Sequence, residues 1–539
     1  MRFFNTAGPV DCRDHYCLPP LERFDLSEIE MLIGQKKYFV LHAPRQTGKT
    51  SSMLALMDYL NQQGNYKALY CNVEAAQAAR EDIAQAMNDI LREMARMARI
   101  YLQDNFLEEQ KYNFLERGGQ GTALATALSR WAESSDQPLI ILMDEIDSLI
   151  GDTLISVLRQ LRTGYNQRPD YFPQSIILCG VRDVRDYRIH SSSTKEIITG
   201  GSAFNIKAES LRLGDFIKSE VESLLDQHTD ETGQKFNSDA VSCIWHLTQG
   251  QPWLVNALAY ETCFRMKEGR DRSLAISKEM VDQAKENLIA RRETHLDQLG
   301  DKLQEERVQR VISPILEGQD LEVRLDDLQY VQDLGLIRET RKGPQVANPI
   351  YAEIIPRELT ISPQANLEAR YDQAWYVRSD GSLDMNKLIS AFQEFFREHS
   401  ESWLQRFQYK EAGPQLLMQA FLQRIVNSGG RVEREFGLGR MRTDLLVLWP
   451  LTEAEPGKPS WTRWQGPVQK VVIELKILYK SLERTIEDGL AQTREYMERC
   501  GTNEGHLVVF DRREKVSWEE KIFSQEESCQ GQKITVWGM

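Results

Sequence analysis

The stretch Tyr38-Phe39-Val40-Leu41-His42-Ala43-Pro44-Arg45-Gln46-Thr47-Gly48-Lys49-Thr50 predicts the fold of the first part of the chain. It begins with a short apolar run of strand length, and residues 51–60 after it show a helical pattern. In a loop that joins a strand to a helix, backbone N–H groups can curl around phosphates at the helix N-terminus. Lys49 then reaches the β- and γ-phosphates, and the Thr50 hydroxyl binds Mg²⁺. We therefore predict a nucleotide-binding P-loop formed by Ala43, Pro44, Arg45, Gln46, Thr47, Gly48, Lys49, Thr50 and Ser51.

Ala43 is a departure from the usual P-loop, which begins with glycine. A methyl group is tolerated there if the local backbone does not need a positive φ. The alternative is that Gly48-Lys49-Thr50 starts a helix by chance. The strand before the loop and the helix after it favour the nucleotide-binding interpretation, with ATP and Mg²⁺ as cofactors.

A second apolar run, residues 139–143, leads directly into Asp144-Glu145. Asp144 at a strand tip can hold Mg²⁺ through water, and Glu145 beside it can polarise the attacking water. The alternative is an acidic strand end that caps the next helix. Asp147 is interpreted as a helix-cap or salt-bridge residue rather than a catalytic one.

A third run, residues 176–179, leads to Gly180-Val181-Arg182. An arginine at this strand tip can sense the γ-phosphate, and Arg182 is the candidate. The alternative is that Arg182 forms a surface pair with Asp183 or Asp186, which contributes little energy.

Short apolar runs alternate with helical stretches over the first part of the chain, which is typical of a parallel α/β sheet. Residues 215–300 have a helical pattern, residues 301–359 resemble a winged helix, and the segment after them is polar and aperiodic. The length of 539 residues also predicts several domains. We expect an ATPase core (1–214), a helical lid (215–300), a winged helix (301–359), a linker with a connecting helix (360–395) and a C-terminal domain (396–539).

The P-loop, the acidic pair, the strand-tip arginine, a Gly250-Gln251-Pro252 turn and the winged helix together resemble the AAA-like ATPases of the STAND class. The resemblance covers about residues 1–359. It implies that Pro252 contacts the nucleotide base, that His15 and Tyr16 lie near the adenine, and that ATP switches conformation rather than turning over rapidly.

A second set of chemical residues lies near the C-terminus. Asp444 enters one strand-like run, and Glu474 and Lys476 lie in another. Residues two apart in a strand share a face, so Glu474 and Lys476 project together, and a hairpin brings Asp444 alongside. Two carboxylates can ligate Mg²⁺, and a lysine can orient water for attack on a phosphodiester.

The next helix carries Gln492 and Tyr496 four residues apart, on one face. This order of residues resembles the PD-(D/E)XK nucleases, in particular their RecB-like branch, over about residues 405–515. The resemblance implies an α/β restriction-endonuclease-like domain and a further glutamate. Glu411 is the first candidate for it, with Glu433 and Glu435 as competitors, and Arg434, Arg440 and Arg442 can meet phosphates.

Two alternatives to a nuclease stay open: a structural sheet with solvated charges, and a related fold that binds without cutting. We expect an ATP-controlled nuclease of the kind found in antiviral defence or mobile elements. One alternative is an ATPase regulator whose C-terminal domain binds nucleic acid or protein, and another is an ATP-driven motor with an accessory nuclease. A homo-oligomer is compatible with any of these.

The net charge of −14 argues against a protein that coats nucleic acid. From Phe396 to Met539, however, 21 Lys and Arg balance 21 Asp and Glu, so nucleic acid, DNA ahead of RNA, is expected at the C-terminal domain. No apolar run reaches membrane-spanning length and no signal-peptide core is present, so we expect a cytoplasmic protein without a membrane partner. Cys12 and Cys17 form no complete zinc set and are expected to be unpaired thiols, with a metal site as the alternative.

Overall fold

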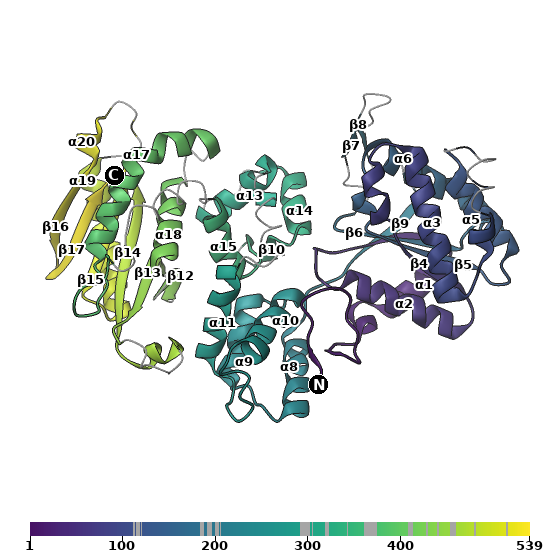
Figure 1. Ribbon diagram of the computed structural model, residues 1–539. Helices are drawn as coiled ribbons and strands as arrows, with labels where there is room; N and C mark the ends of the chain where they lie inside the picture. The colour runs from purple at the N-terminus through teal and green to yellow at the C-terminus, as the bar shows by residue number, and fades with distance from the viewer. Residues whose placement is uncertain are drawn as a thin grey trace. The chain divides into compact units, whose positions relative to one another are not determined.

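The structure is a computed structural model, and the chain divides by its contacts into two compact units. The first comprises Met1–Phe236, Ile244–Tyr260 and Leu325–Arg338, and the second comprises Asn237–Cys243, Glu261–Arg324 and Glu339–Met539 (Figure 1). The structure describes residues 1–110, 114, 119, 121–183, 188–190, 197–199, 204, 206–291, 302–303, 305–317, 323–341, 343–359, 375–407, 413–426, 430–438, 441–452, 460–478, 481–511, 513 and 516–539.

The first unit is built on a five-stranded parallel sheet in the order β4-β5-β6-β3-β9. Its strands are β3 (Tyr38–His42), β4 (Lys67–Asn72), β5 (Leu139–Asp144), β6 (Ser175–Gly180) and β9 (Lys207–Arg212). The predicted parallel α/β fold is confirmed. The apolar pattern did not reveal β9, because charged residues interrupt this edge strand.

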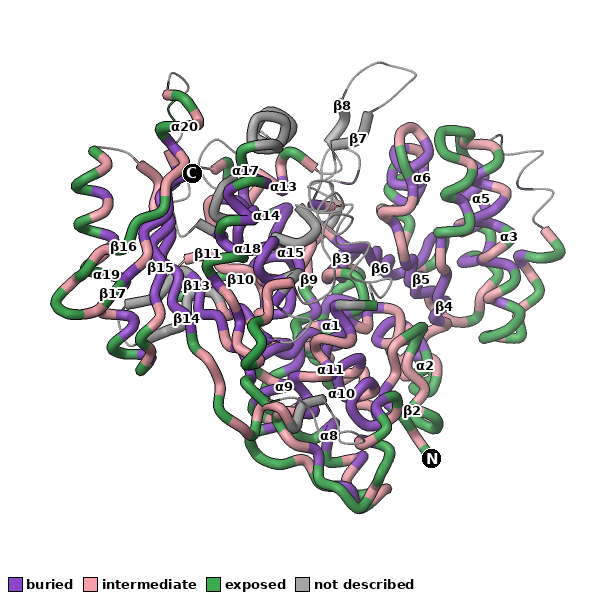
Figure 2. Tube along the Cα trace, turned by 60° about the vertical axis from the view of Figure 1, so that its left-hand side comes forward, coloured by how far each residue is buried: buried purple, intermediate pink, exposed green. Residues whose placement is uncertain are grey.

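Helices cover both faces of this sheet, which explains why its inner strands are continuous apolar runs. One face packs against α3 (Ile83–Leu102), α5 (Ala123–Ser134) and α6 (Gly151–Thr163), and the other against α1 (Leu26–Gly34) and α2 (Lys49–Gln63). Figure 2 shows α3, α5 and α6 with both buried and exposed residues, as expected for helices that cover a core.

Smaller elements complete the first unit. They are β1 (Phe3–Phe4), β2 (His15–Tyr16), η1 (Pro20–Arg23), η2 (Glu74–Ala79), η3 (Ile146–Ser148), η4 (Tyr165–Gln167), β7 (Arg188–His190), β8 (Ile197–Thr199), α8 (Lys218–Thr232), α10 (Pro252–Tyr260) and α14 (Leu325–Asp333). Two elements, α9 (Ser238–Thr248) and β10 (Ile337–Thr340), extend across a boundary between the units.

The second unit contains a mixed six-stranded sheet in the order β12-β13-β14-β15-β17-β16. β14 pairs antiparallel with β13 on one side and parallel with β15 on the other. The strands are β12 (Arg431–Leu438), β13 (Met441–Pro450), β14 (Val468–Ile477), β15 (Glu504–Phe510), β16 (Phe523–Cys529) and β17 (Gln532–Gly538).

Helices cover both faces of the mixed sheet too. α17 (Met385–Phe407) and α18 (Gly413–Val426) contribute to the core on one face, and α19 (Leu482–Cys500) packs on the other. The expected domain boundary at residue 396 falls inside α17, and the core begins already at Leu383. The reason is that Leu388, Phe392 and Phe396 lie on one continuous helix and are buried in the same core.

The other elements of the second unit are η6 (Glu261–Arg265), α11 (Lys278–Arg291), α13 (Glu306–Glu317), β11 (Gly343–Val346), α15 (Pro349–Leu359), η7 (Ser460–Gln465) and α20 (Trp518–Lys521). Part of the expected linker, residues 360–374, lies outside the described residues. Among the helices that are described, none is both long and apolar enough to cross a membrane.

We predict that Gly489→Ala destabilises the C-terminal sheet domain. Alanine normally stabilises a helix interior by about 1 kcal/mol relative to glycine. A Cβ at position 489 of α19, however, would lie 2.5 Å from Cδ1 of the buried Leu507. Overpacking of this kind costs about 1 to 3 kcal/mol, so the sign should reverse. Thermal unfolding checks this against Asp488→Ala at the neighbouring exposed position, and a raised melting temperature for Gly489→Ala would contradict it.

Candidate functional site

The predicted P-loop lies between β3 and α2. Ala43 N donates to Gly180 O at 3.2 Å, so the backbone at Ala43 continues the strand ladder and accepts a methyl group. Gly48 is the N-cap of α2 and has a φ of 92°, a left-handed value that favours glycine. The loop therefore needs glycine at residue 48 and tolerates alanine at residue 43.

Lys49 folds back over the loop. Its Nζ donates to Ala43 O and Pro44 O, each at 3.0 Å, and the residue is 5% exposed. Thr47 Oγ1 donates to Pro44 O at 2.8 Å, so side chains of the loop also fix its own backbone. Arg45 and Gln46 at the tip of the loop are exposed.

Asp144 is fully buried and lies beside the start of α2. Thr50 Oγ1 donates to Asp144 Oδ2 at 2.8 Å, so the structure brings these two predicted metal-binding residues together. Tyr70 from β4 also donates to Oδ2, at 3.0 Å, and Glu145 N donates to Oδ1 at 2.9 Å. Burial raises the pKa of Tyr70, so its hydroxyl keeps its proton and remains a donor.

Sequence reasoning missed Tyr70, because it lies in an apolar strand far from Asp144 in sequence. The only signal was a tyrosine within a buried run, whose hydroxyl must find a partner. The register of β4 and β5 supplies that partner: Asn72 aligns with Asp144, and Tyr70 lies two residues before Asn72.

Glu145 follows Asp144 in a left-handed conformation with a φ of 57°. Burial, and then the charge of Asp147, raise the pKa of the Glu145 carboxyl, while Lys49 opposes this shift. Asp147 Oδ1 accepts a hydrogen bond from Val181 N at 3.2 Å, which joins the ends of β5 and β6. This contact is neither the helix cap nor the salt bridge expected for Asp147.

Arg182 lies just beyond the end of β6, the strand next to β3. Its guanidinium carbon lies 4.7 Å from the ring centroid of Tyr330 in α14. The sequence had suggested the γ-phosphate or an acidic neighbour as its contact. Of the acidic neighbours, Asp186 is outside the described residues.

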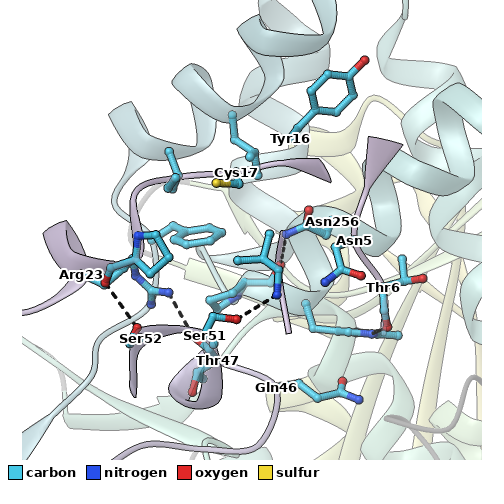
Figure 3. A pocket seen from close by; sticks show the side chains of 18 of the residues that line it. Asn5, Thr6, Tyr16, Cys17, Arg23, Gln46, Thr47, Ser51, Ser52 and Asn256 are labelled. Carbon is cyan, nitrogen blue, oxygen red and sulfur yellow. Dashed lines mark hydrogen bonds between the residues drawn. The ribbon is translucent and has the colours of Figure 1, made fainter. Parts of the chain in front are cut away.

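A cavity of about 140 Å³ adjoins the P-loop (Figure 3). Its wall combines the loop, the N-terminal segment and α10. Val10 N donates to Ser51 Oγ at 2.9 Å, and Trp253 Nε1 donates to Thr6 O at 2.9 Å, which holds the segment in place. The lining residues are Asn5, Thr6, Ala7, Gly8, Val10, Tyr16, Cys17, Leu18, Pro20, Arg23, Gln46, Thr47, Gly48, Ser51, Ser52, Phe216, Leu224, Pro252, Trp253 and Asn256.

Of the residues expected near the base, Pro252 and Tyr16 line this cavity. The ring of His15 packs edge-on against Phe3 at 4.7 Å, and its Nδ1 accepts from Asp11 N at 2.9 Å. The structure therefore gives His15 contacts within the N-terminal segment.

The Gly-Gln-Pro turn places Pro252 at the start of α10. Gly250 has a φ of 82°, and a Cβ there would lie 2.0 Å from Phe216 O, so the turn requires glycine. Gln251 Oε1 accepts from Leu254 N at 2.6 Å and caps the helix. These contacts fix one wall of the cavity.

Arg23 is another residue that sequence reasoning missed. Its Nη1 donates to Thr47 O at 3.0 Å, its Nη2 donates to Gly214 O, and its guanidinium lies 4.6 Å from the ring centroid of Phe216. Arg23 thus joins the segment before α1 to the P-loop.

The expectation of unpaired thiols at Cys12 and Cys17 was wrong. The structure pairs them in a disulfide, with 5.4 Å between their Cα atoms. The short turn that leads into β2 brings them together. No group of three or more His, Cys, Asp and Glu side chains suited to a metal ion occurs among the residues that the structure describes.

In the second unit, Glu474 is 3% exposed, and Lys476 Nζ donates to its Oε1 at 2.6 Å. Leu445 pairs with Ile473 across β13 and β14, so Asp444 and Glu474 are the next positions on their strands. Gln492 is exposed on α19, whereas Tyr496 is buried.

Some of the remaining nuclease candidates lie on strands of the second sheet, and others lie outside the described residues. Glu433 lies on β12, and burial raises the pKa of its carboxyl. Glu435 and Arg434 also lie on β12, and Arg442 lies on β13. Glu411 and Arg440 lie outside the described residues.

We predict that Tyr70→Phe destabilises the first unit, because it removes a donor from a fully buried carboxylate. Loss of such a hydrogen bond costs about 1 to 3 kcal/mol. Tyr59→Phe is the matched control, since its hydroxyl donates to the exposed Glu30 at 2.6 Å. Thermal unfolding should show the larger loss for Tyr70→Phe, and equal melting temperatures would contradict the buried contact.

No curated protein sequence matches the chain. A Walker-type ATPase of Pyrococcus abyssi is 15% identical with a TM-score of 0.43, over 65% of this chain and 99% of that one. Cdc6p of Pyrobaculum aerophilum is 15% identical with a TM-score of 0.35, over 64% and 95%. Drosophila ORC bound to DNA is 12% identical with a TM-score of 0.33, over 64% and 87%.

The family model of the AAA-like domain matches residues 32–355, more than half of the chain, so the protein belongs to the AAA-like domain family.

Proposed function

We propose that this protein is an ATP-controlled, Mg²⁺-dependent nuclease in which the AAA-like ATPase domain governs a C-terminal cleavage centre. The observation that carries the ATP-dependent part is the 2.8 Å hydrogen bond between Thr50 and Asp144 beside the P-loop. It places a hydroxyl and a carboxylate at the start of the helix where phosphates bind.

The Thr50 hydroxyl and the Asp144 carboxylate suit Mg²⁺, which prefers oxygen ligands. The bound ion would neutralise charge on the phosphates. Lys49 contributes a second positive charge, and the backbone N–H groups from Ala43 to Ser51 orient the phosphate chain.

Glu145 is the proposed base. Its carboxyl is partly buried and its pKa is raised, which brings it closer to the pH at which a base works. Arg182 is the proposed γ-phosphate sensor and would exchange its contact with Tyr330 for the phosphate. Pro252 is the proposed contact to the base, supported by its position in the cavity wall.

The nuclease part is carried by the pair formed by Glu474 and Lys476. In the antiparallel register, Asp444 is the next position opposite Glu474. Two carboxylates from adjacent strands can hold Mg²⁺, and the lysine can hold a water or the scissile phosphate. The metal would lower the pKa of the attacking water.

The register also favours Glu435 as the third carboxylate. Arg434 pairs with Leu445 and Phe436 with Thr443, so Glu435 is the position on β12 opposite Asp444 in the register. Glu433, by contrast, pairs with Leu446, two residues along the strand. Glu411 stays a candidate from the family resemblance.

Gln492 and Arg442 complete the proposed centre, and DNA is its proposed substrate. Gln492 is exposed on the helix that packs on β14, where it can reach a ligand without displacing core residues. The balanced charge of this region leaves it less repulsive to phosphates than the acidic remainder of the chain.

We predict that Lys49→Ala abolishes ATP binding, because it removes the ammonium that meets the β- and γ-phosphates.

We predict that Glu145→Gln binds ATP normally and hydrolyses it about 100-fold more slowly, as expected for a lost base. Equilibrium binding and phosphate release measure the two effects. Unchanged ATP affinity in folded Lys49→Ala, or normal turnover in Glu145→Gln, would overturn the assignment.

We predict that Asp444→Ala and Glu474→Ala abolish Mg²⁺-dependent cleavage through loss of the metal, and that Lys476→Ala stops cleavage while Mg²⁺ still binds. Lys470→Ala is the matched control, an exposed lysine on the same strand. The assay compares DNA and RNA cutting in Mg²⁺ and in EDTA, with and without ATP.

Cutting that persists in EDTA, or full activity in all three variants, would exclude this centre. Nucleic-acid binding without cutting under every nucleotide condition would favour the alternative, an ATPase regulator with a C-terminal binding domain. Glu435→Ala and Glu411→Ala in the same assay decide which of these two residues supplies the third carboxylate.

A further inference from the structure

Arg23 places a second cation at the nucleotide site, from a segment outside the P-loop. It lines the cavity beside Thr47 and Gly48, and its Nη1 would lie 3.2 Å from a Cβ at residue 48. Figure 3 shows Arg23 and the loop residues Thr47 and Ser51 around the same space.

The guanidinium is held mainly by neutral groups. Carbonyl oxygens of Thr47 and Gly214 accept from it, and the ring of Phe216 stacks against it. Among the described residues, no carboxylate forms an ion pair with it within 4.0 Å, although Asp215 and Glu220 act on it from further away. Burial lowers the pKa of Arg23, which reflects the cost of keeping this charge away from water.

A partly buried charge that lacks a close counter-ion is stabilised when a ligand supplies one. The cavity adjoins an anion-binding loop, so the matching ligand is a phosphate. Lys49 serves the β- and γ-phosphates at the other end of the loop. Arg23 packs against Phe216, which lines the same cavity as Pro252, the proposed contact to the base.

We propose that Arg23 is a nucleotide-binding residue that contacts the phosphate nearest the ribose. This inference rests on the proposed nucleotide binding by the P-loop. Arg23 adds a phosphate contact from the N-terminal segment. Because ATP, ADP and AMP all carry that phosphate, the contact should strengthen the binding of all three. Arg23 also joins that segment to Thr47, so the bound nucleotide would fix the segment against the loop.

The test measures binding of ATP, ADP and AMP to wild type, Arg23→Gln, Arg23→Lys and Arg2→Gln. Arg2 is the matched control, because it lies in the same segment but pairs with Glu231 at 3.0 Å. Arg23→Gln should weaken all three ligands by the same factor, about 10- to 100-fold, the scale of a charged hydrogen bond. Arg23→Lys should retain part of the affinity, and Arg2→Gln should match wild type.

The melting temperature of the free protein separates binding from structure. Reduced stability of Arg23→Gln with unchanged nucleotide affinity would overturn the proposal, as would a loss confined to ATP. If Arg23→Gln does not fold, phenylglyoxal modification of wild type replaces it: ATP should protect Arg23, and equal modification with and without ATP would overturn the proposal. A wild type that binds no nucleotide would instead refute the proposed function.

Discussion

The hydrogen bond between Thr50 and Asp144 depends on the whole architecture of the first unit. Thr50 lies in the helix that follows β3, and Asp144 is the last residue of β5. These two strands are not neighbours, because β6 lies between them. The two residues meet only because all three strands run parallel and end at the same edge of the sheet. That arrangement requires helices on both faces, which is why the strands consist of buried apolar residues. Core packing thus sets the geometry of the contact between Thr50 and Asp144.

Short, contiguous features of this site were predictable from sequence. The P-loop and the Asp144-Glu145 pair each follow an apolar strand directly, so local pattern was enough. Contacts between distant segments were not predictable: Tyr70 reaches Asp144 across 74 positions, and Arg23 reaches Thr47 across 24. The disulfide between Cys12 and Cys17 was missed for a different reason, since spacing alone does not show whether two thiols approach.

In the second unit, too, a contact between segments that are distant in the chain was not predictable from sequence. The sequence assigns α11 to a lid and β12 to a separate C-terminal domain, yet Arg431 Nη1 of β12 lies 2.6 Å from Asp282 Oδ2 of α11. The guanidinium also lies 4.2 Å from the ring centroid of Trp464. Helical pattern could place each element but not their contact. Under the proposed function, this link gives α11 a direct connection to the strand next to Asp444.

Strand alternation correctly placed Glu474 and Lys476 together, and their surroundings bear on why they are there. Glu474 follows three fully buried apolar residues on a strand at the centre of the sheet. Desolvating a carboxylate there is costly, and the 2.6 Å contact with Lys476 offsets only part of that cost. Apolar residues of similar volume would serve stability at least as well. A charged pair at this position is therefore not explained by stability alone, and under the proposed function Glu474 and Asp444, opposite each other in the register, would hold the metal ion.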